Sequence, residues 1–545
     1  MNRRFMFKKK SVKPAIIQPP PQPFILTPEY KQSVLEKSYI GKKGFTIPKS
    51  CLIEQDIEGI KKELTMIPKV GFAGSTNAPI SSFPVYRENT NKIYLPRFYG
   101  ITRYGLPVKS ELTEGEDIDI QFTKELRDYQ NNIVGIYLDY VGENESSEKT
   151  NKNPKGAILE VPCGRGKTVM ALKILAEIKK KTLILVHKEF LMNQWIERIG
   201  EFLPSARVGK IQANTFDVEG KDIVIGMIQT MFSRDFDPSV FDCFGLTIID
   251  EVHRIGSEEF SKTLLKIVTP YMLGISATVE RKDGLTKLLY MFIGEKIYTE
   301  ERVDQDPVVI RGIEYISNDE EFNETDVDWK GMPKVSTMIS KICDFGPRSD
   351  FIIRVLKDLI LESKGEGQIM VLAHNRSLLK YLYEAIEYQG FATRGYYIGG
   401  MKESALKDTE DQQIVLATYA MAAEALDIKT LSILVMVTPK VDIEQSVGRI
   451  LRERHSNPIV VDIIDRHDTF QNQWRKRKTF YRKCNYRILK TSSTKYNGFS
   501  ESEMATWKTE FEPREQSCST ETIDNKINKE KGEETEIKCL LKIPK

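Results

Sequence analysis

Seven consecutive residues have the types that bind the phosphates of a nucleotide. They follow an apolar run, GAILEV at 156–161, and lead into an amphipathic segment, TVMALKILAEIKK at 168–180. Two glycines let backbone N–H groups curl around phosphates, a lysine supplies a cation to the terminal phosphates, and a threonine hydroxyl can bind Mg2+. The segment departs from the G-x-x-x-x-G-K-[ST] pattern because Val161 takes the position of the first glycine. The predicted phosphate loop is Pro162, Cys163, Gly164, Arg165, Gly166, Lys167 and Thr168.

Two adjacent carboxylates end another apolar run, LTIIDEVH at 246–253. A nucleoside triphosphatase needs such groups at the tip of a strand near the phosphate loop. We expect Asp250 to hold Mg2+ through water, and Glu251 to orient and deprotonate the attacking water. Two acids at a strand end are otherwise an ordinary solvated turn, and the phosphate loop upstream favours the catalytic interpretation.

The elements that must position these residues alternate between short β-branched runs and longer amphipathic segments, which is typical of a doubly wound α/β domain with a parallel sheet. The same alternation restarts near Pro307, so we predict two such domains in tandem. The predicted organisation is a basic, Pro-rich disordered tail at 1–30, an N-terminal accessory domain at 31–120, the first α/β domain at 121–303, the second at 304–490 and a disordered tail at 491–545.

Composition narrows the class of protein. The chain has 545 residues, 40% of them hydrophobic, and its 80 basic and 77 acidic residues nearly cancel, so any basic surface must be local. The seven cysteines include no CxxC pair, which fits neither a disulfide framework nor a zinc site. Neither a secretory signal nor a long apolar span is evident, so we expect an intracellular protein that is not secreted and does not enter a membrane.

Asp250 to His253 and Ser276 to Thr278 together resemble motifs II and III of superfamily 2 DExH helicases. Leu126 to Gln130 (LRDYQ) resembles the upstream motif in which glutamine reads adenine, which implies ATP and a site that includes Arg127 and Gln130. VHKEFLMNQW at 186–195, containing Gln194, resembles motif Ia. Ile228 to Thr230 resembles the element that touches the nucleic-acid backbone. The resemblance implies coupling roles for His253, Ser276 and Thr278, and nucleic-acid contacts for Gln194, Thr230 and Thr418.

The second domain continues the resemblance. Ala417-Thr418 with 424–427 resembles motif V, which implies that Asp427 belongs to the nucleotide site, and QSVGRILR at 445–452 resembles motif VI. Arg449 and Arg452 are three residues apart, so on a helix they share a face and can reach the γ-phosphate as arginine fingers, with Gln445 in the same motif. The implied fold is two RecA-like domains, with ATP and Mg2+ bound between them.

Within the superfamily, Ser276 to Thr278 followed by RKDG at 281–284 resembles the XPB-type branch, and GFTIPKS at 44–50 resembles the domain before the motor in transcript-release helicases of large cytoplasmic DNA viruses, poxvirus-like and giant-virus. Lys282, where the branch carries Glu, and Ala425, where motif V usually has glycine, depart from the pattern. The resemblance implies a monomeric, 3′ to 5′ motor on DNA or a DNA–RNA hybrid in viral transcription, with RNA polymerase or transcription factors as partners. The implied location is host cytoplasm, and also the virion.

Two rival functions stay open. An RNA helicase of the same superfamily would show ATPase stimulated by RNA and not by DNA. A non-catalytic scaffold would bind nucleic acid or polymerase through its terminal regions with a silent motor, and the complete set of motor residues argues against it. The stretch WRKRKTFYRKCNYRILK at 474–490 also has two interpretations: contact with phosphates and bases, or a closing helix whose aromatics pack on the second domain.

Overall fold

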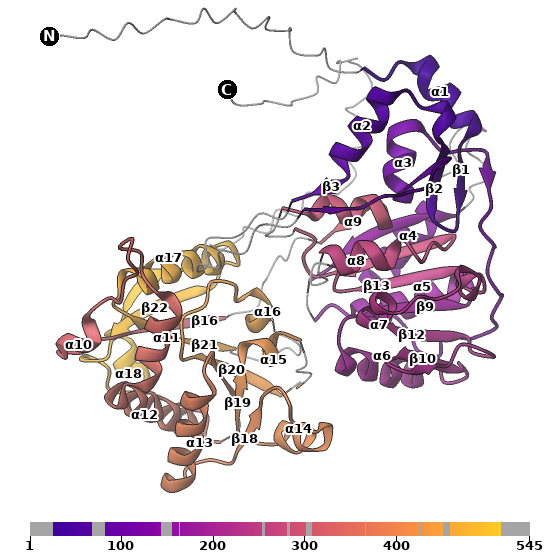
Figure 1. The fold of residues 1–545 in the computed structure, drawn as a ribbon. Helices are drawn as coiled ribbons and strands as arrows, with labels where there is room; N and C mark the ends of the chain where they lie inside the picture. The colour runs from indigo at the N-terminus through magenta and orange to yellow at the C-terminus, as the bar shows by residue number, and fades with distance from the viewer. Residues whose placement is uncertain are drawn as a thin grey trace, which may run out of the picture.

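Three folded units account for the residues that the computed structural model describes (Figure 1). These residues are 25–67, 82–142, 155–162, 164–252, 257–280, 284–300, 308–365, 367–424, 428, 430–448, 450 and 458–513. Among them, no helix combines the length and the apolar character that crossing a membrane requires. A mixed N-terminal unit is followed by two units built on parallel sheets.

The N-terminal unit packs a five-stranded sheet, in the order β5-β6-β2-β1-β7, against helices. Its pairs are antiparallel except for the parallel pair β1–β7. Helix α1 starts at Pro28 because Thr27 caps it, accepting a hydrogen bond from the backbone N–H of Tyr30 at 3.3 Å. The elements are α1 (Pro28–Lys37), β1 (Tyr39–Gly41), β2 (Gly44–Pro48), a short 3-10 helix (Lys49–Cys51), α2 (Glu54–Glu63), β3 (Thr65–Met66), β4 (Phe83–Pro84), β5 (Arg87–Glu88), β6 (Lys92–Leu95), α3 (Arg97–Tyr104) and β7 (Lys109–Ser110).

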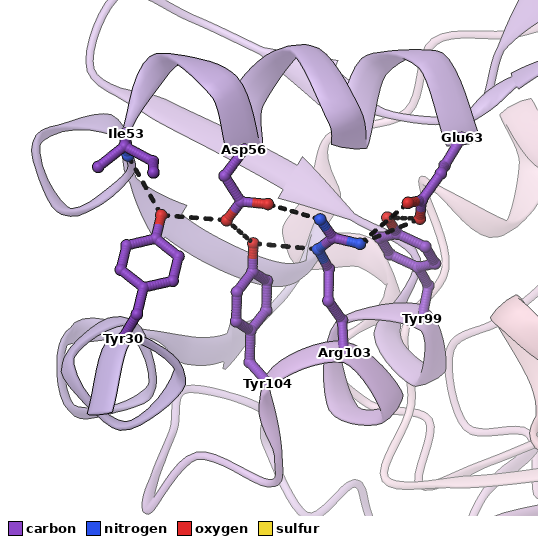
Figure 2. Close-up of polar contacts among 7 residues, drawn as sticks. All are labelled: Tyr30, Ile53, Asp56, Glu63, Tyr99, Arg103 and Tyr104. Atoms are coloured by element: carbon purple, nitrogen blue, oxygen red, sulfur yellow. Dashed lines mark hydrogen bonds and ion pairs between the residues drawn. The ribbon is translucent and has the colours of Figure 1, made fainter. Parts of the chain in front are cut away.

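A buried polar network ties three helices of this unit together (Figure 2). The fully buried carboxylate of Asp56 accepts hydrogen bonds from the hydroxyls of Tyr30 at 3.0 Å and Tyr104 at 2.5 Å, and from the Arg103 guanidinium at 2.6 Å. The same guanidinium donates to both oxygens of Glu63 at 3.1 Å. Each polar group therefore has a partner, which is what a charge needs to be stable away from water.

The N-terminal unit shares a core with the first parallel-sheet domain. Phe98 of α3 and Phe292 of α9 (Thr286–Ile293) belong to one buried cluster that spans both units. The Arg97 side chain is buried at this junction and donates to the backbone carbonyls of Thr269 at 2.9 Å and Pro270 at 2.8 Å. Burial lowers the pKa of Arg97 to about 10. This continuous core fixes the accessory unit to the domain that carries the phosphate loop.

The first parallel-sheet domain has eight strands in the order β11-β10-β12-β9-β13-β14-β8-β15, all parallel except the β10–β11 pair. Along β9, Leu183 and Leu185 enter one buried cluster while Ile184 and Val186 enter another, so both faces of the sheet are covered. The strands are β8 (Gly156–Glu160), β9 (Thr182–Val186), β10 (Val208–Gln212), β11 (Thr215–Phe216), β12 (Ile223–Met227), β13 (Leu246–Asp250), β14 (Tyr271–Ser276) and β15 (Glu295–Thr299). The helices are α4 (Asp128–Val141), α5 (Lys167–Ile178), α6 (Glu189–Phe202), α7 (Ile228–Ser233), a 3-10 turn (Pro238–Phe241), α8 (Ser257–Leu264) and α9.

The second parallel-sheet domain repeats this design with the order β18-β19-β17-β20-β21-β16-β22-β23. All neighbouring pairs are parallel except β22–β23. The strands are β16 (Val309–Tyr315), β17 (Gln368–Ala373), β18 (Arg394–Tyr397), β19 (Ile414–Thr418), β20 (Leu431–Met436), β21 (Ile459–Asp465), β22 (Arg487–Ser492) and β23 (Lys508–Phe511). The helices are α10 (Glu320–Asn323), α11 (Val335–Asp344), α12 (Gly346–Glu362), α13 (Arg376–Gln389), α14 (Glu403–Glu410), α15 (Tyr419–Glu424), α16 (Glu444–Val447), α17 (Asp468–Lys483) and α18 (Glu501–Met504). Two α/β domains with parallel sheets confirm the predicted fold class.

The boundary predicted at residue 490 is wrong. Strand β22 crosses it, and β23 pairs antiparallel with β22 to close the edge of the second sheet. Trp507, just before β23, is 5% exposed and packs with Tyr496 in the domain core. The sequence predicts a tail here because these residues are mostly polar, but an edge strand with one solvated face is also polar. Residues 514–545, the rest of the predicted tail, and 1–24 lie outside the described residues.

Candidate nucleotide and nucleic-acid sites

The phosphate loop connects β8 to α5 and is anchored at its start. The N–H of Val161 donates to the carbonyl of Ser276, at the end of β14, at 2.9 Å. Gly164 and Gly166 both have left-handed backbone angles, with φ of +82° and +80°, which a residue with a side chain adopts only with strain. Gly166 caps the N-terminus of α5, so the loop directs the helix dipole and backbone N–H groups toward an anion. Cys163 lies outside the described residues.

Gln130 lies directly against this loop. Its side-chain amide donates to the carbonyl of Arg165 at 3.1 Å, and its oxygen accepts from the backbone N–H of Arg127 at 3.0 Å, as part of the cap that starts α4. A Cβ added to Gly166 would lie 2.4 Å from the Gln130 nitrogen. The glutamine is therefore held from both sides, and Gly166 is needed both for its φ angle and for the space that Gln130 occupies.

Arg165 is held by two residues that the sequence did not single out. Its guanidinium lies 3.8 Å from the centre of the Tyr129 ring and forms an ion pair with Glu300, which follows β15. The Tyr129 hydroxyl also donates to the Arg165 carbonyl at 3.3 Å. Tyr129 could have been suggested by its place beside Gln130, whereas Glu300 is distant in sequence and carried no signal.

Lys167 and the two predicted carboxylates come together at the ends of β8 and β13. The Lys167 Nζ is 3.8 Å from Glu251 Oε1, and both side chains are largely buried. Glu251 has a φ of +49°, a left-handed conformation that costs a residue with a side chain about 1–2 kcal/mol. The Glu251 N–H donates to Asp250 Oδ1 at 2.9 Å, which holds this turn. Such strain next to a charged pair is typical of a functional site.

Trp195 of α6 fixes the other oxygen of Asp250. The indole Nε1 donates to Asp250 Oδ2 at 2.9 Å, and both groups are buried. Burial, together with the nearby charge of Glu251, raises the pKa of Asp250 to about 6. The charged form of Asp250 is therefore unfavourable without a cation, so this carboxylate is suited to bind a metal ion. Trp195 is a site residue that the sequence analysis missed, since only chain folding brings it to Asp250.

The oxygen donors available here fit Mg2+. Thr168 lies half-buried in the first turn of α5, and Asp250 ends a strand of the same sheet. One or two protein oxygens completed by substrate phosphates and water is the usual Mg2+ arrangement, whereas Zn2+ uses nitrogen and sulfur. Within the described residues, no cluster of three or more His, Cys, Asp and Glu could hold a metal by itself. The residues present therefore favour a metal that arrives with the nucleotide.

Ser276, one of the residues predicted to couple the two sites, ends β14 and pairs with Glu160 of β8. Its side chain is fully buried, and its hydroxyl donates to the carbonyl of Thr278 at 2.6 Å. Glu160, at the end of β8, accepts from the N–H of Val279 at 2.7 Å. The segment after β14 is thus hydrogen-bonded to the strand that carries the phosphate loop. His253, the third residue of the predicted coupling set, lies outside the described residues.

The residues predicted to contact nucleic acid lie at the same edge of the sheets but farther along it. Gln194 is on α6, after β9, and is half-buried. Thr230 on α7 is only 8% exposed, and its hydroxyl accepts from the N–H of Ala213 at 3.0 Å. Gln229, the residue before Thr230 on α7, is exposed instead. Thr418 is half-buried at the end of β19 in the second domain.

The predicted motif VI falls largely on residues that the structure does not describe. Asp427, Arg449 and Arg452 lie outside the described residues. Gln445 is in α16, which follows β20. The helix that carries Trp195 and Gln194 also meets the second domain, where Phe190 of α6 packs against the core cluster beneath α15 and α17. The element that fixes Asp250 therefore contacts both parallel-sheet domains.

Comparisons with known proteins place the chain among helicases. Residues 123–281 match the family described as "Type III restriction enzyme, res subunit". The chain is 33% identical over 464 residues to "Putative ATP-dependent RNA helicase L396" of Acanthamoeba polyphaga mimivirus, covering 83% of this chain and 87% of that protein. It is 27% identical over 389 residues to "Putative ATP-dependent RNA helicase QP509L" of African swine fever virus, covering 67% of this chain and 75% of that protein. The solved structure of S. cerevisiae Dbp5 bound to RNA and ADP BeF3 is 11% identical with a TM-score of 0.47, covering 67% of this chain and 90% of that chain.

Proposed function

Because this chain belongs to the family of superfamily 2 ATP-dependent helicases found in large DNA viruses, we propose that it binds and hydrolyses ATP where β8 and β13 end. The observation that carries the proposal is the meeting of Lys167, Glu251 and Asp250 there, beside a loop whose backbone can wrap phosphates. We assign adenine recognition to Gln130, and its hydrogen bond to the phosphate loop supports a place in the nucleotide site. The site is complete enough to argue against a silent scaffold.

Each residue has a step in hydrolysis. The Lys167 ammonium, now 3.8 Å from Glu251, would turn to the terminal phosphates when ATP binds. That movement would break the Lys167–Glu251 ion pair, and the Glu251 carboxylate would then orient a water and accept its proton. Thr168 and Asp250 would hold Mg2+, which supplies charge to neutralise the phosphate oxygens. The proposed arginine fingers, Arg449 and Arg452 with Gln445, would come from the second domain and add a factor of about 10³ to 10⁵ in rate.

We further propose that the two parallel-sheet domains, 121–303 and from 304 onward, move relative to each other on each ATP cycle and carry a strand along Gln194, Thr230 and Thr418. Ser276 and Thr278 would transmit the nucleotide state, because their segment is bonded to the strand of the phosphate loop. We also propose that Asp427 belongs to the nucleotide site and that His253 helps to couple ATP hydrolysis to movement. The accessory unit would move as one body with the first domain, since they share a core.

The substrate that we propose is DNA or a DNA–RNA hybrid, with 3′ to 5′ movement, as in the XPB-type transcript-release helicases that the motifs resemble. Such a motor would work with RNA polymerase or transcription factors. The rival is an RNA substrate, which the names of the mimivirus and African swine fever virus relatives favour, because both are named as RNA helicases. RNA carries a ribose 2′-OH that DNA lacks, so an assay that compares the two nucleic acids distinguishes these proposals directly.

The deciding experiment compares ATPase activity with single-stranded DNA, duplex DNA, a DNA–RNA hybrid and single-stranded RNA, using Lys167→Ala as the inactive control. We expect strong stimulation by DNA-containing substrates. Stimulation by RNA alone would replace the proposed substrate by RNA. Binding of nucleic acid without any ATPase would support the scaffold and overturn the motor.

A further inference from the structure

Helix α17 divides its side chains between two opposite faces. Its buried residues are Phe470, Trp474, Arg477 and Tyr481, at spacings of four, three and four residues. Trp474 packs on β16, where a Cβ on Gly312 would lie 3.2 Å from the indole. Trp474, Tyr481 and Tyr486 are therefore core residues, and the partly buried Phe480 packs against the same cluster. Rings held in this way argue against base stacking, which was one of the two contacts expected if this segment binds nucleic acid.

One cation of the helix is also structural. The Arg477 guanidinium is 1% exposed and donates to Asp462 from Nε at 2.7 Å and from a terminal nitrogen at 2.9 Å. Its remaining nitrogen donates to the carbonyl of Lys440 at 2.9 Å, in the loop that leads from β20 into α16. Arg477 thus fixes α17 next to the helix that begins motif VI, on the same face of the second sheet.

The opposite face of α17 carries four exposed cations, Arg475, Lys476, Arg482 and Lys483. At about 100° per residue they fall within an arc of about 120°, and at about 1.5 Å per residue they span about 12 Å of the helix. Within the described part of the chain none of the four forms an ion pair. Two acidic residues of the C-terminal segment pair with other cations: Glu510 with Lys478, and Glu512 with Arg487. No acidic residue occurs from 469 to 483.

Ordinary explanations cover only part of this face. Cations in the last turn stabilise the helix dipole, which accounts for Arg482 and Lys483. Arg475 and Lys476 lie about two turns earlier, beyond the reach of that effect. The whole chain has 80 basic and 77 acidic residues, so an uncompensated group of four is a local feature and not a general excess. Figure 1 shows α17 on the outside of the second domain.

We propose that this basic face of α17 binds the phosphate backbone of nucleic acid, as an electrostatic contact separate from the strand path along Gln194, Thr230 and Thr418. The inference rests on the proposed function, since it requires that the protein acts on nucleic acid. Charge complementarity selects the ligand: four unpaired cations on a convex helix fit a line of phosphates, and the buried aromatics leave no means of reading bases. The contact is therefore independent of sequence and sensitive to salt.

The test is the salt dependence of binding to a fluorescent single-stranded oligonucleotide. The test variant combines Arg475→Gln, Lys476→Gln, Arg482→Gln and Lys483→Gln. Because each phosphate contact contributes about 0.7 to the slope of log K against log salt for single strands, we expect the slope to fall by up to about 3. The control variant removes four exposed cations elsewhere, Lys62, Lys357, Lys364 and Lys380, and should keep the wild-type slope.

Further arms separate folding from contact. A variant with only Arg482→Gln and Lys483→Gln should lose about half as much slope, and one with Arg475→Lys and Arg482→Lys should lose almost none, since charge and not shape is used. Basal ATPase should stay at the wild-type value in all of them, and the melting temperature should fall only slightly where Arg482 and Lys483, the cations of the last turn, are replaced by Gln. A wild-type slope in the four-residue variant would overturn the proposal and leave an acidic protein segment as the partner of this face. Failure of the wild type to bind any nucleic acid would overturn the proposed function as well.

Discussion

Replacing Gly166 by alanine tests how the phosphate loop is held. The added Cβ would lie 2.4 Å from the Gln130 nitrogen, so the amide must move and give up its hydrogen bond to the Arg165 carbonyl. The φ of +80° adds a second cost, because alanine is strained there by about 1–2 kcal/mol. With about 0.5–1.5 kcal/mol for the hydrogen bond, the ATP-competent loop should be disfavoured by about 1.5–3.5 kcal/mol.

That free energy corresponds to a loss of about 10- to 300-fold in ATP affinity. Steady-state ATPase kinetics and direct nucleotide binding measure it, with melting temperature as the check on folding. The matched control is Gly135→Ala in α4, where nothing lies within 4 Å of the added Cβ. That change should stabilise the helix by up to about 1 kcal/mol and leave ATP affinity unchanged. Wild-type ATP affinity in Gly166→Ala would refute the role given to Gln130 and the loop geometry.

Four other substitutions or conditions have defined outcomes. Lys167→Ala should abolish ATP turnover while the protein melts normally, since the ammonium lies in the site at the strand ends, where it pairs with Glu251. At limiting Mg2+, ATPase activity should fall as the pH drops through about 6, because the carboxyl of Asp250, whose pKa is raised, takes up a proton and loses Mg2+. Trp195→Phe should move this fall to higher pH, because it removes the hydrogen bond that favours the charged form of Asp250. Arg97→Met should lower the free energy of unfolding in urea by about 2–4 kcal/mol, because it leaves the carbonyls of Thr269 and Pro270 without donors. Asp56→Asn should cost about 3 kcal/mol, measured by denaturation, since it removes the buried charge that faces Arg103, and an equal stability would mean that the network of Figure 2 is not needed.

The sequence predicted the strands and the phosphate loop because both depend on local pattern. Strands such as β9 are apolar on both faces, so their runs are unmistakable, and glycines before a lysine and threonine identify a phosphate loop from residue type and spacing alone. The interpretation of 474–490 was undecidable from sequence, since the same residues serve as core or as surface depending on which face of α17 meets the sheet.

What sequence could not supply are the contacts between distant segments. Trp195 reaches Asp250, and Glu300 reaches Arg165, only after the chain folds. The left-handed turn at Glu251 is imposed by its surroundings, because no local preference of glutamate would predict it. Strand β23 is stabilised by pairing with β22 and not by its own composition, so its polar residues predict a tail and not a strand.

The most direct test is strand displacement from a DNA–RNA hybrid with a single-stranded 3′ DNA tail, comparing the wild type with Glu251→Gln. Movement driven by hydrolysis at the end of β13 predicts that the wild type displaces the RNA only when ATP is present. The variant should bind ATP and the hybrid normally and displace nothing, since the amide keeps the size of Glu251 but cannot accept the proton of the attacking water. Displacement by Glu251→Gln at the wild-type rate, or displacement by the wild type without ATP, would contradict a motor powered at this site.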